Sequence, residues 1–165
     1  LNGLIHIGQT QIPAGRYDFW EIRPSIEYNE SAPVSFGVRS TFGGFFGGDI
    51  STVEPTIRAR YGETFNLSLS YGRNDIDLPT GSTIINLTSM RVAYNFSPRV
   101  FTQALLQHND SDKLWSVNFR AGWLQDANTG FFLVYNETEG FGRVLPSGAG
   151  RSLILKYSYL FDVLG

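Results

Sequence analysis

Cysteine is absent from this chain, and its absence excludes a disulfide framework and thiol-based metal or redox chemistry. The formal net charge of −2 lacks the bias that a nucleic-acid partner or an acidic substrate would require. No apolar run approaches the length of about 18 residues that a transmembrane helix needs. The first residues, LNGLIHIGQT, lack the basic and apolar regions of a secretory signal. We therefore expect that a signal was removed or that the chain is the tail of a longer protein.

Residues that favour strands and turns are abundant. Aromatic residues make up 15% of the chain, there are 18 glycines, and good helix formers are few. No segment combines a helical period with a start and a stop signal. These features predict an all-β protein. A membrane remains open, because the strands of a membrane barrel need only about 9–11 residues each and are half polar.

The segment KLWSVNFRAGWLQ, residues 113–125, shows the pattern that recurs along the chain. Trp115, Phe119 and Trp123 fall on one face of a strand, whereas Asn118 and Arg120 fall on the other. About nine such strands are predicted between residues 16 and 161, and a weaker tenth is expected near residues 4–12. The faces of VFTQALLQ, residues 100–107, stay ambiguous.

Tight connections alternate with larger ones between these strands. The tight connections are residues 29–33, 61–64, 96–99 and 125–130, and the larger or more polar ones are residues 42–49, 73–82, 108–113 and 138–150. This alternation predicts an antiparallel up-and-down meander with short turns at one rim and longer loops at the other. Bacterial outer-membrane barrels have the same asymmetry.

Aromatic residues gather beside the tight turns and at the C-terminal end, and Phe101 is among them. Rings collected at one rim are typical of the girdle that membrane barrels place at the depth of the lipid headgroups. We predict that the following residues face lipid or form the girdle: Trp20, Tyr28, Tyr61, Phe65, Tyr94, Phe96, Trp115, Phe119, Trp123, Phe131, Tyr157, Tyr159 and Phe161.

The opposite face carries many charges, and we predict that these charges face the lumen: Glu21, Arg23, Glu27, Arg39, Glu54, Arg58, Arg60, Arg91, Arg120 and Lys156. In a dry core each unpaired ion would cost several kcal/mol, so a water-filled or salt-bridged lumen fits better. An open lumen with this excess of cations would favour anions, whereas a closed one would contain salt-bridge ladders between strands. Both alternatives stay open.

Candidate catalytic and metal-binding groups are few. His108 with Asn109 and Ser111 resembles the residue set of a Ser-His-Asn hydrolase, but the crowding of the three residues indicates a polar loop instead. The Asp-x-Asp pairs at residues 75–77 and 110–112 lack the ligand number of a calcium loop. We therefore predict no enzyme activity, no cofactor and no metal.

The stretch from Arg91 to Glu137, followed by RSLILKYSYLF at residues 151–161, resembles a family. The matching features are the Tyr-x-Phe-Ser-Pro-Arg turn at residues 94–99, the Leu-Gln-His-Asn segment after it, the Asn-x-Arg strand at residues 118–120, Phe-Leu-Val-Tyr-Asn at residues 132–136 and a closing strand that ends in Phe161. The family comprises uncharacterised bacterial envelope proteins that carry an N-terminal carbohydrate-binding-like β-sandwich followed by an outer-membrane β-barrel domain. The resemblance covers the last 75 residues.

If the resemblance holds, the N-terminal binding domain and the first strands of the barrel lie outside this chain. One departure concerns the C-terminus. Many outer-membrane proteins end at an aromatic residue that the insertion machinery recognises, whereas four residues follow Phe161 here. Recognition would therefore need an internal version of that signal.

These observations lead to one expectation for the whole chain. We expect residues 1–165 to be a single porin-like outer-membrane β-barrel domain of a Gram-negative cell envelope, with residues 1–14 only weakly assigned and further sequence preceding them. About ten transmembrane β-strands are visible, as the C-terminal part of a larger barrel. The expected function is a membrane anchor for an N-terminal module or partner complex, and the expected partners are membrane lipids and other envelope proteins, with no nucleic acid.

Two alternatives remain. The first is a pore or transporter for small anionic or sugar-like solutes. The second is a soluble all-β binding module, since alternating strands with glycine-rich turns are most often soluble. The rim aromatics, the charged face and the loop asymmetry favour the membrane.

Overall fold

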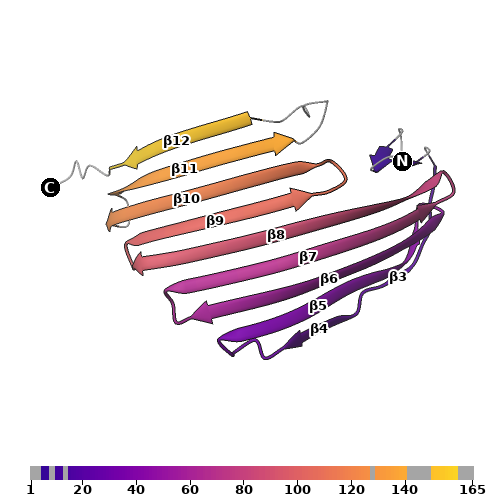
Figure 1. Cartoon of the computed structure of the whole chain (residues 1–165), viewed down its shortest axis with the longest axis horizontal. Helices are drawn as coiled ribbons and strands as arrows, with labels where there is room; N and C mark the ends of the chain where they lie inside the picture. Colours follow the sequence, from indigo (N-terminus) through magenta and orange to yellow (C-terminus); the bar gives the residue numbers. More distant parts are fainter. Residues whose placement is uncertain (1–4, 8–9, 13–14, 127–128, 141–149, 160–165) are drawn as a thin grey trace, which may run out of the picture.

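The computed structural model describes residues 5–7, 10–12, 15–126, 129–140 and 150–159. These residues form a ten-stranded antiparallel sheet with up-and-down connections and a separate two-stranded sheet, with no helix among them (Figure 1). The prediction of an all-β up-and-down meander is confirmed. The strands are β1 (Ile5–Ile7), β2 (Thr10–Ile12), β3 (Glu21–Ile22), β4 (Ser25–Tyr28), β5 (Val34–Phe45), β6 (Gly48–Tyr61), β7 (Phe65–Leu78), β8 (Gly81–Ser97), β9 (Val100–Asn109), β10 (Leu114–Asp126), β11 (Thr129–Gly140) and β12 (Gly150–Ser158).

The two edges of the large sheet differ. One edge is β12, and the other is shared by β3 and β4, which both pair with β5. Pro24 separates β3 from β4 and has no backbone N–H, but its carbonyl still accepts a hydrogen bond of 2.9 Å from the Ser40 N–H. Among the described strands β12 and β3 do not pair, so the sheet remains open.

Two of the predicted long loops are wrong, because residues 42–49 and 73–82 continue the strands into tight hairpins. Only Phe46 and Gly47 connect β5 to β6, and only Pro79 and Thr80 connect β7 to β8. Phe46 (φ 49°) and Gly47 (φ 84°) both adopt left-handed backbone angles, as a two-residue hairpin turn requires. The loop asymmetry is therefore absent at these two places. Residues 141–149, in the last long connection, lie outside the described residues.

In place of the single weak strand expected near residues 4–12, the structure has two short strands, β1 and β2, which do not join the large sheet. The described part of that segment folds back on itself, and Ile5 pairs with Ile12 in the small sheet. Ile12 is buried against Ile76 and Leu78 at the tip of the β7–β8 hairpin. Tertiary contact at this tip, and not pairing with the large sheet, places the segment.

Within the described residues, no second layer covers the faces of the large sheet. In the part of the chain that the structure describes, the buried hydrophobic residues are only Ile12, Ile76 and Leu78. A soluble sandwich buries one face of each sheet against the other sheet, about 10 Å away. Here Tyr61 is 79% exposed and Ile26 is 70% exposed. The sheet alone therefore leaves its apolar side chains uncovered.

The β5–β6 turn gives a test of the fold. Gly47→Ala should destabilise the protein by about 1–2 kcal/mol, because a Cβ disfavours the left-handed backbone. Gly72→Ala is the matched control, since a Cβ there would meet no atom closer than 3.8 Å. Thermal unfolding followed by circular dichroism measures both. Equal midpoints for the two variants would contradict the turn.

Candidate functional site

The register of the sheet defines two faces, since directly paired residues lie on the same side. Trp123 pairs with Phe131, and Phe131 pairs with Tyr157. We call this side the apolar face and the opposite side the polar face. The predicted lipid-facing residues that the register places together on the apolar face are Tyr28, Tyr61, Phe65, Tyr94, Trp115, Phe119, Trp123, Phe131 and Tyr157.

Regular strand pairing does not assign the remaining predicted aromatic residues to the apolar face. Trp20 precedes β3, Tyr159 follows β12, and Phe161 lies outside the described residues. Phe96 sits in β8 at a register irregularity, where its ring contacts Tyr94 with 4.6 Å between centroids. Phe101 differs from expectation, because it pairs with Gly122 and its ring covers that glycine on the polar face. Regular alternation along β9 therefore places Phe101 on the polar face, next to Val100 on the apolar face.

The apolar face carries an apolar band of limited width. Among the exposed large hydrophobic residues that the register pairs, only Leu87 and Ile154 lie on the polar face. The band extends from Val34 to Phe42 on β5, from Val53 to Tyr61 on β6, and from Trp115 to Trp123 on β10. Each stretch is about nine residues long, the length that a tilted barrel strand needs to cross a bilayer.

The border of this apolar band crosses the sheet obliquely. It ends at Phe42 on β5 and at Leu153 on β12, where Arg151 follows. Followed from strand to strand, the register connects Leu153 on β12 to Val34 on β5. The border on β5 lies at Phe42, eight residues beyond Val34, so it shifts by about eight residues over seven strand-to-strand steps. With about 3.3 Å per residue and about 4.8 Å between strands, the slope is about 38°.

Beyond the border the polarity of the two faces reverses. On β6 and β7 the apolar face now carries Asp49, Ser51 and Asp75, and the polar face carries Ile50 and Ile76. The reversed hairpin tips form their own small core around Ile12, Ile76 and Leu78. The distribution of polar and apolar side chains over the two faces therefore changes at this level.

The register places nine of the ten predicted lumen-facing charges on the polar face: Glu21, Glu27, Arg39, Glu54, Arg58, Arg60, Arg91, Arg120 and Lys156. Arg23 lies between β3 and β4 and forms an ion pair with Glu21. That this face lines a lumen stays a prediction.

Glu27 and Arg58 form an ion pair that spans two strand steps. The Arg58 Nη1 donates to Glu27 Oε2 over 2.8 Å. Gly37 lies on the strand between them, and a Cβ at this position would collide with the Glu27 carboxylate. The missing side chain of Gly37 thus opens the path that joins β4 to β6.

Polar ladders continue on the other strands. The Asn118 amide donates to Asn136, and the Asn136 amide donates to the Ser152 hydroxyl over 3.2 Å. Arg120 Nε donates to Asn118 Oδ1 over 3.1 Å. These bonds link β10, β11 and β12 across the polar face.

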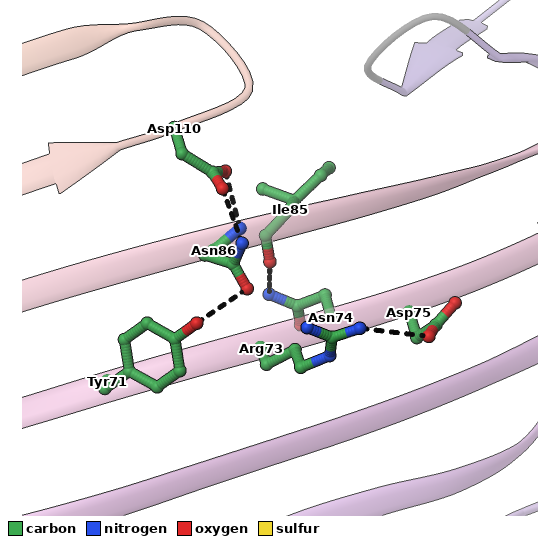
Figure 2. A network of polar contacts seen from close by, with 7 residues as sticks. All are labelled: Tyr71, Arg73, Asn74, Asp75, Ile85, Asn86 and Asp110. Carbon is green, nitrogen blue, oxygen red and sulfur yellow. Dashed lines mark hydrogen bonds and ion pairs between the residues drawn. The ribbon is translucent and has the colours of Figure 1, made fainter.

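A second network lies near the border of the apolar band and connects β7, β8 and the β9–β10 turn (Figure 2). The Tyr71 hydroxyl donates to Asn86 Oδ1 over 2.9 Å, and the Asn86 backbone N–H donates to Asp110 Oδ1 over 2.7 Å. The two hydrogen bonds from Asn86, first from its backbone and then from its side chain, lower the pKa of Asp110 below its ordinary value. Asp110 therefore fixes the turn to β8.

The candidate hydrolase residues do not assemble. His108 belongs to β9 and not to a loop, and its ring lies 4.4 Å from the Trp115 ring on the apolar face. Ser111 N–H donates to Asn109 Oδ1 within the turn that follows. No group of three or more histidine or acidic side chains suited to a metal ion occurs within the described ranges.

Comparison of the chain with family models, curated proteins and solved structures finds no match in any of the three. The resemblance to the bacterial envelope family therefore stays a prediction. In the described part of the chain, no helix is long and apolar enough to cross a bilayer.

The bridge over Gly37 gives a double-mutant test. Gly37→Ala should displace the flexible Glu27 carboxylate and lower the midpoint of unfolding by about as much as Glu27→Gln, a small loss because solvent screens this pair. The two changes together should cost no more than either alone, because both remove the same ion pair. Thermal unfolding of the three variants measures this, and additive losses would contradict the bridge.

The Asn86–Asp110 contact gives a pH test. Because the pKa of Asp110 is lowered in the folded state, its stabilising contact is complete above the ordinary pKa and is lost as the pH falls through the folded-state pKa. The Asn86 amide resonance should therefore titrate with a midpoint below that of an unperturbed aspartate. In Asp110→Asn this titration should vanish. An amide shift that is independent of pH in the parent chain would contradict the contact.

Proposed function

We propose that the large sheet is part of a bacterial outer-membrane β-barrel and that the barrel anchors this chain in the membrane. The apolar band would meet lipid, and the polar face would line the interior. The oblique band carries this proposal, because its width and slope have a common explanation. Strands of outer-membrane barrels tilt by roughly 35–45° and expose an apolar zone about 25 Å tall. The border is inclined by about 38° to the direction perpendicular to the strands. In a barrel whose strands tilt by the same angle, the border would therefore run parallel to the membrane plane.

The chemistry beyond the band supports the same placement. Asp49, Asp75 and Asp77 share the apolar face above the border, where water would surround them. Carboxylates on a lipid-facing surface would be costly, whereas in the aqueous zone they are favourable. The border between Tyr71 and Arg73 would thus mark the membrane surface on β7.

Strand direction supports a barrel with additional strands. The path from β3 through β5 to β12 contains nine strand positions, so the two edges run in the same direction. Closure with antiparallel pairs alone would need an odd number of further strands between the edges, since an antiparallel barrel needs an even total. This parity supports the proposal that the sheet is the C-terminal part of a larger barrel.

The hairpin tips suggest how the anchor would hold a module or partner. The β5–β6 and β7–β8 hairpins continue past the apolar band and pack around Ile12, Ile76 and Leu78. A packed tip outside the membrane offers a rigid platform to an N-terminal module or to other envelope proteins. Lipids would contact the band, and envelope proteins would contact the tips.

A matched pair of arginine substitutions tests the proposed orientation. Phe119→Arg should block assembly, because arginine near the bilayer midplane on the lipid face costs about 2–4 kcal/mol. Asn118→Arg, one residue away on the polar face, should assemble almost as well as the parent chain. The readouts are membrane fractionation and heat-modifiable migration of the full-length protein on gels. Equal tolerance of both substitutions would contradict the orientation.

A further inference from the structure

The charges on the polar face are unevenly distributed. Its carboxylates lie on β3, β4 and β6, at Glu21, Glu27 and Glu54. From β7 to β12 the described residues of this face include three cations, Arg91, Arg120 and Lys156, and no carboxylate. The described residues form no ion pair with any of these three cations. Their positive charge is therefore not balanced within this part of the sheet.

The register places these cations on a line parallel to the border of the apolar band. In register, Arg120 on β10 lies two residues closer to the short turns than Arg91 on β8. Lys156 on β12 lies two residues closer to them than Arg120. Arg39 on β5 continues this line. Arg39 is three residues from Phe42, and Lys156 is three residues from Leu153, where the border crosses β5 and β12. In a barrel with tilted strands, all four would lie at one depth.

The surroundings of this line leave room for a ligand. All four cationic side chains are exposed. Thr56 and Ser70, on the two strands between Arg39 and Arg91, have short hydroxylated side chains. Arg39 pairs in register with Glu54 and also interacts electrostatically with Glu27 on β4, so one of the four cations has carboxylate neighbours. The four-residue line thus carries a net positive charge on exposed side chains.

We propose that Arg39, Arg91, Arg120 and Lys156 form a charge belt at one depth of the lumen that binds and passes small anions such as chloride, phosphate and carboxylates. This proposal rests on the proposed membrane barrel and adds a solute to it. Rings of arginine and lysine select anions in pores, because guanidinium and ammonium groups replace part of the hydration shell of the anion. Cations enclosed in a dry lumen without carboxylates would be costly, so water and mobile anions are the better partners.

The test is the zero-current voltage of the full-length protein in a planar bilayer under a potassium chloride gradient. The parent protein should prefer chloride over potassium. The triple variant Arg91→Gln, Arg120→Gln and Lys156→Gln should lower the permeability ratio by about threefold or more, and Arg120→Glu should lower it further than Arg120→Gln. Arg73→Gln is the control, because Arg73 lies on the apolar face and is paired with Asp75. It should leave the ratio unchanged.

Heat-modifiable migration of every variant separates this proposal from the membrane anchor. A barrel that inserts but conducts no ions, or a triple variant with the selectivity of the parent, would overturn the charge belt and leave the anchor intact. A chain that never inserts into membranes would overturn the anchor and the belt together. Chloride preference that is lost only in the belt variants would support the proposal.

Discussion

The apolar band lacks a partner within the described chain, and this constraint governs the rest of the structure. Each square ångström of apolar surface left in water costs about 25 cal/mol, so a band that crosses β3 to β12 needs a covering medium. A second sheet or a layer of helices would cover it in a soluble domain. The described residues supply neither, and their buried hydrophobic residues gather instead at one hairpin tip. Lipid is the medium that requires no further protein layer.

The residue patterns on the two faces of the sheet have the same slope relative to the strands. The oblique border of the apolar band and the oblique line of cations follow the same register shift, although they lie on opposite sides. Side-chain alternation alone would not produce this agreement, because each strand could shift its polar residues independently. In a barrel, a membrane outside and an aqueous lumen inside would share one axis. Selection for function would then give the apolar border and the line of cations the same slope. The reversal of polarity at the hairpin tips would follow from the same proposed boundary.

The sequence predicted much of this arrangement because strand alternation is local. The period of two between Trp115 and Trp123 predicted a strand and its faces without any knowledge of its neighbours. The turns at Phe46–Gly47 and Pro79–Thr80 were missed, since glycine-rich and polar residues are typical of loops and also of strands that leave an apolar zone. Packing of Ile12 on Ile76 and Leu78, and of Phe101 on Gly122, depends on contacts between strands that no local pattern indicates. The alignment of Arg39, Arg91, Arg120 and Lys156 was not apparent from the sequence, because it depends on the register across seven strand-to-strand steps.

Tryptophan quenching by brominated lipids tests the central claim most directly. Trp115 and Trp123 lie on β10 at opposite ends of its part of the apolar band, so single-tryptophan variants that retain one or the other report on two depths. We predict that bromine near the lipid headgroups quenches both tryptophans strongly, whereas an aqueous quencher has little effect. A chain that is folded in plain buffer, with both tryptophans insensitive to brominated lipid, would contradict it.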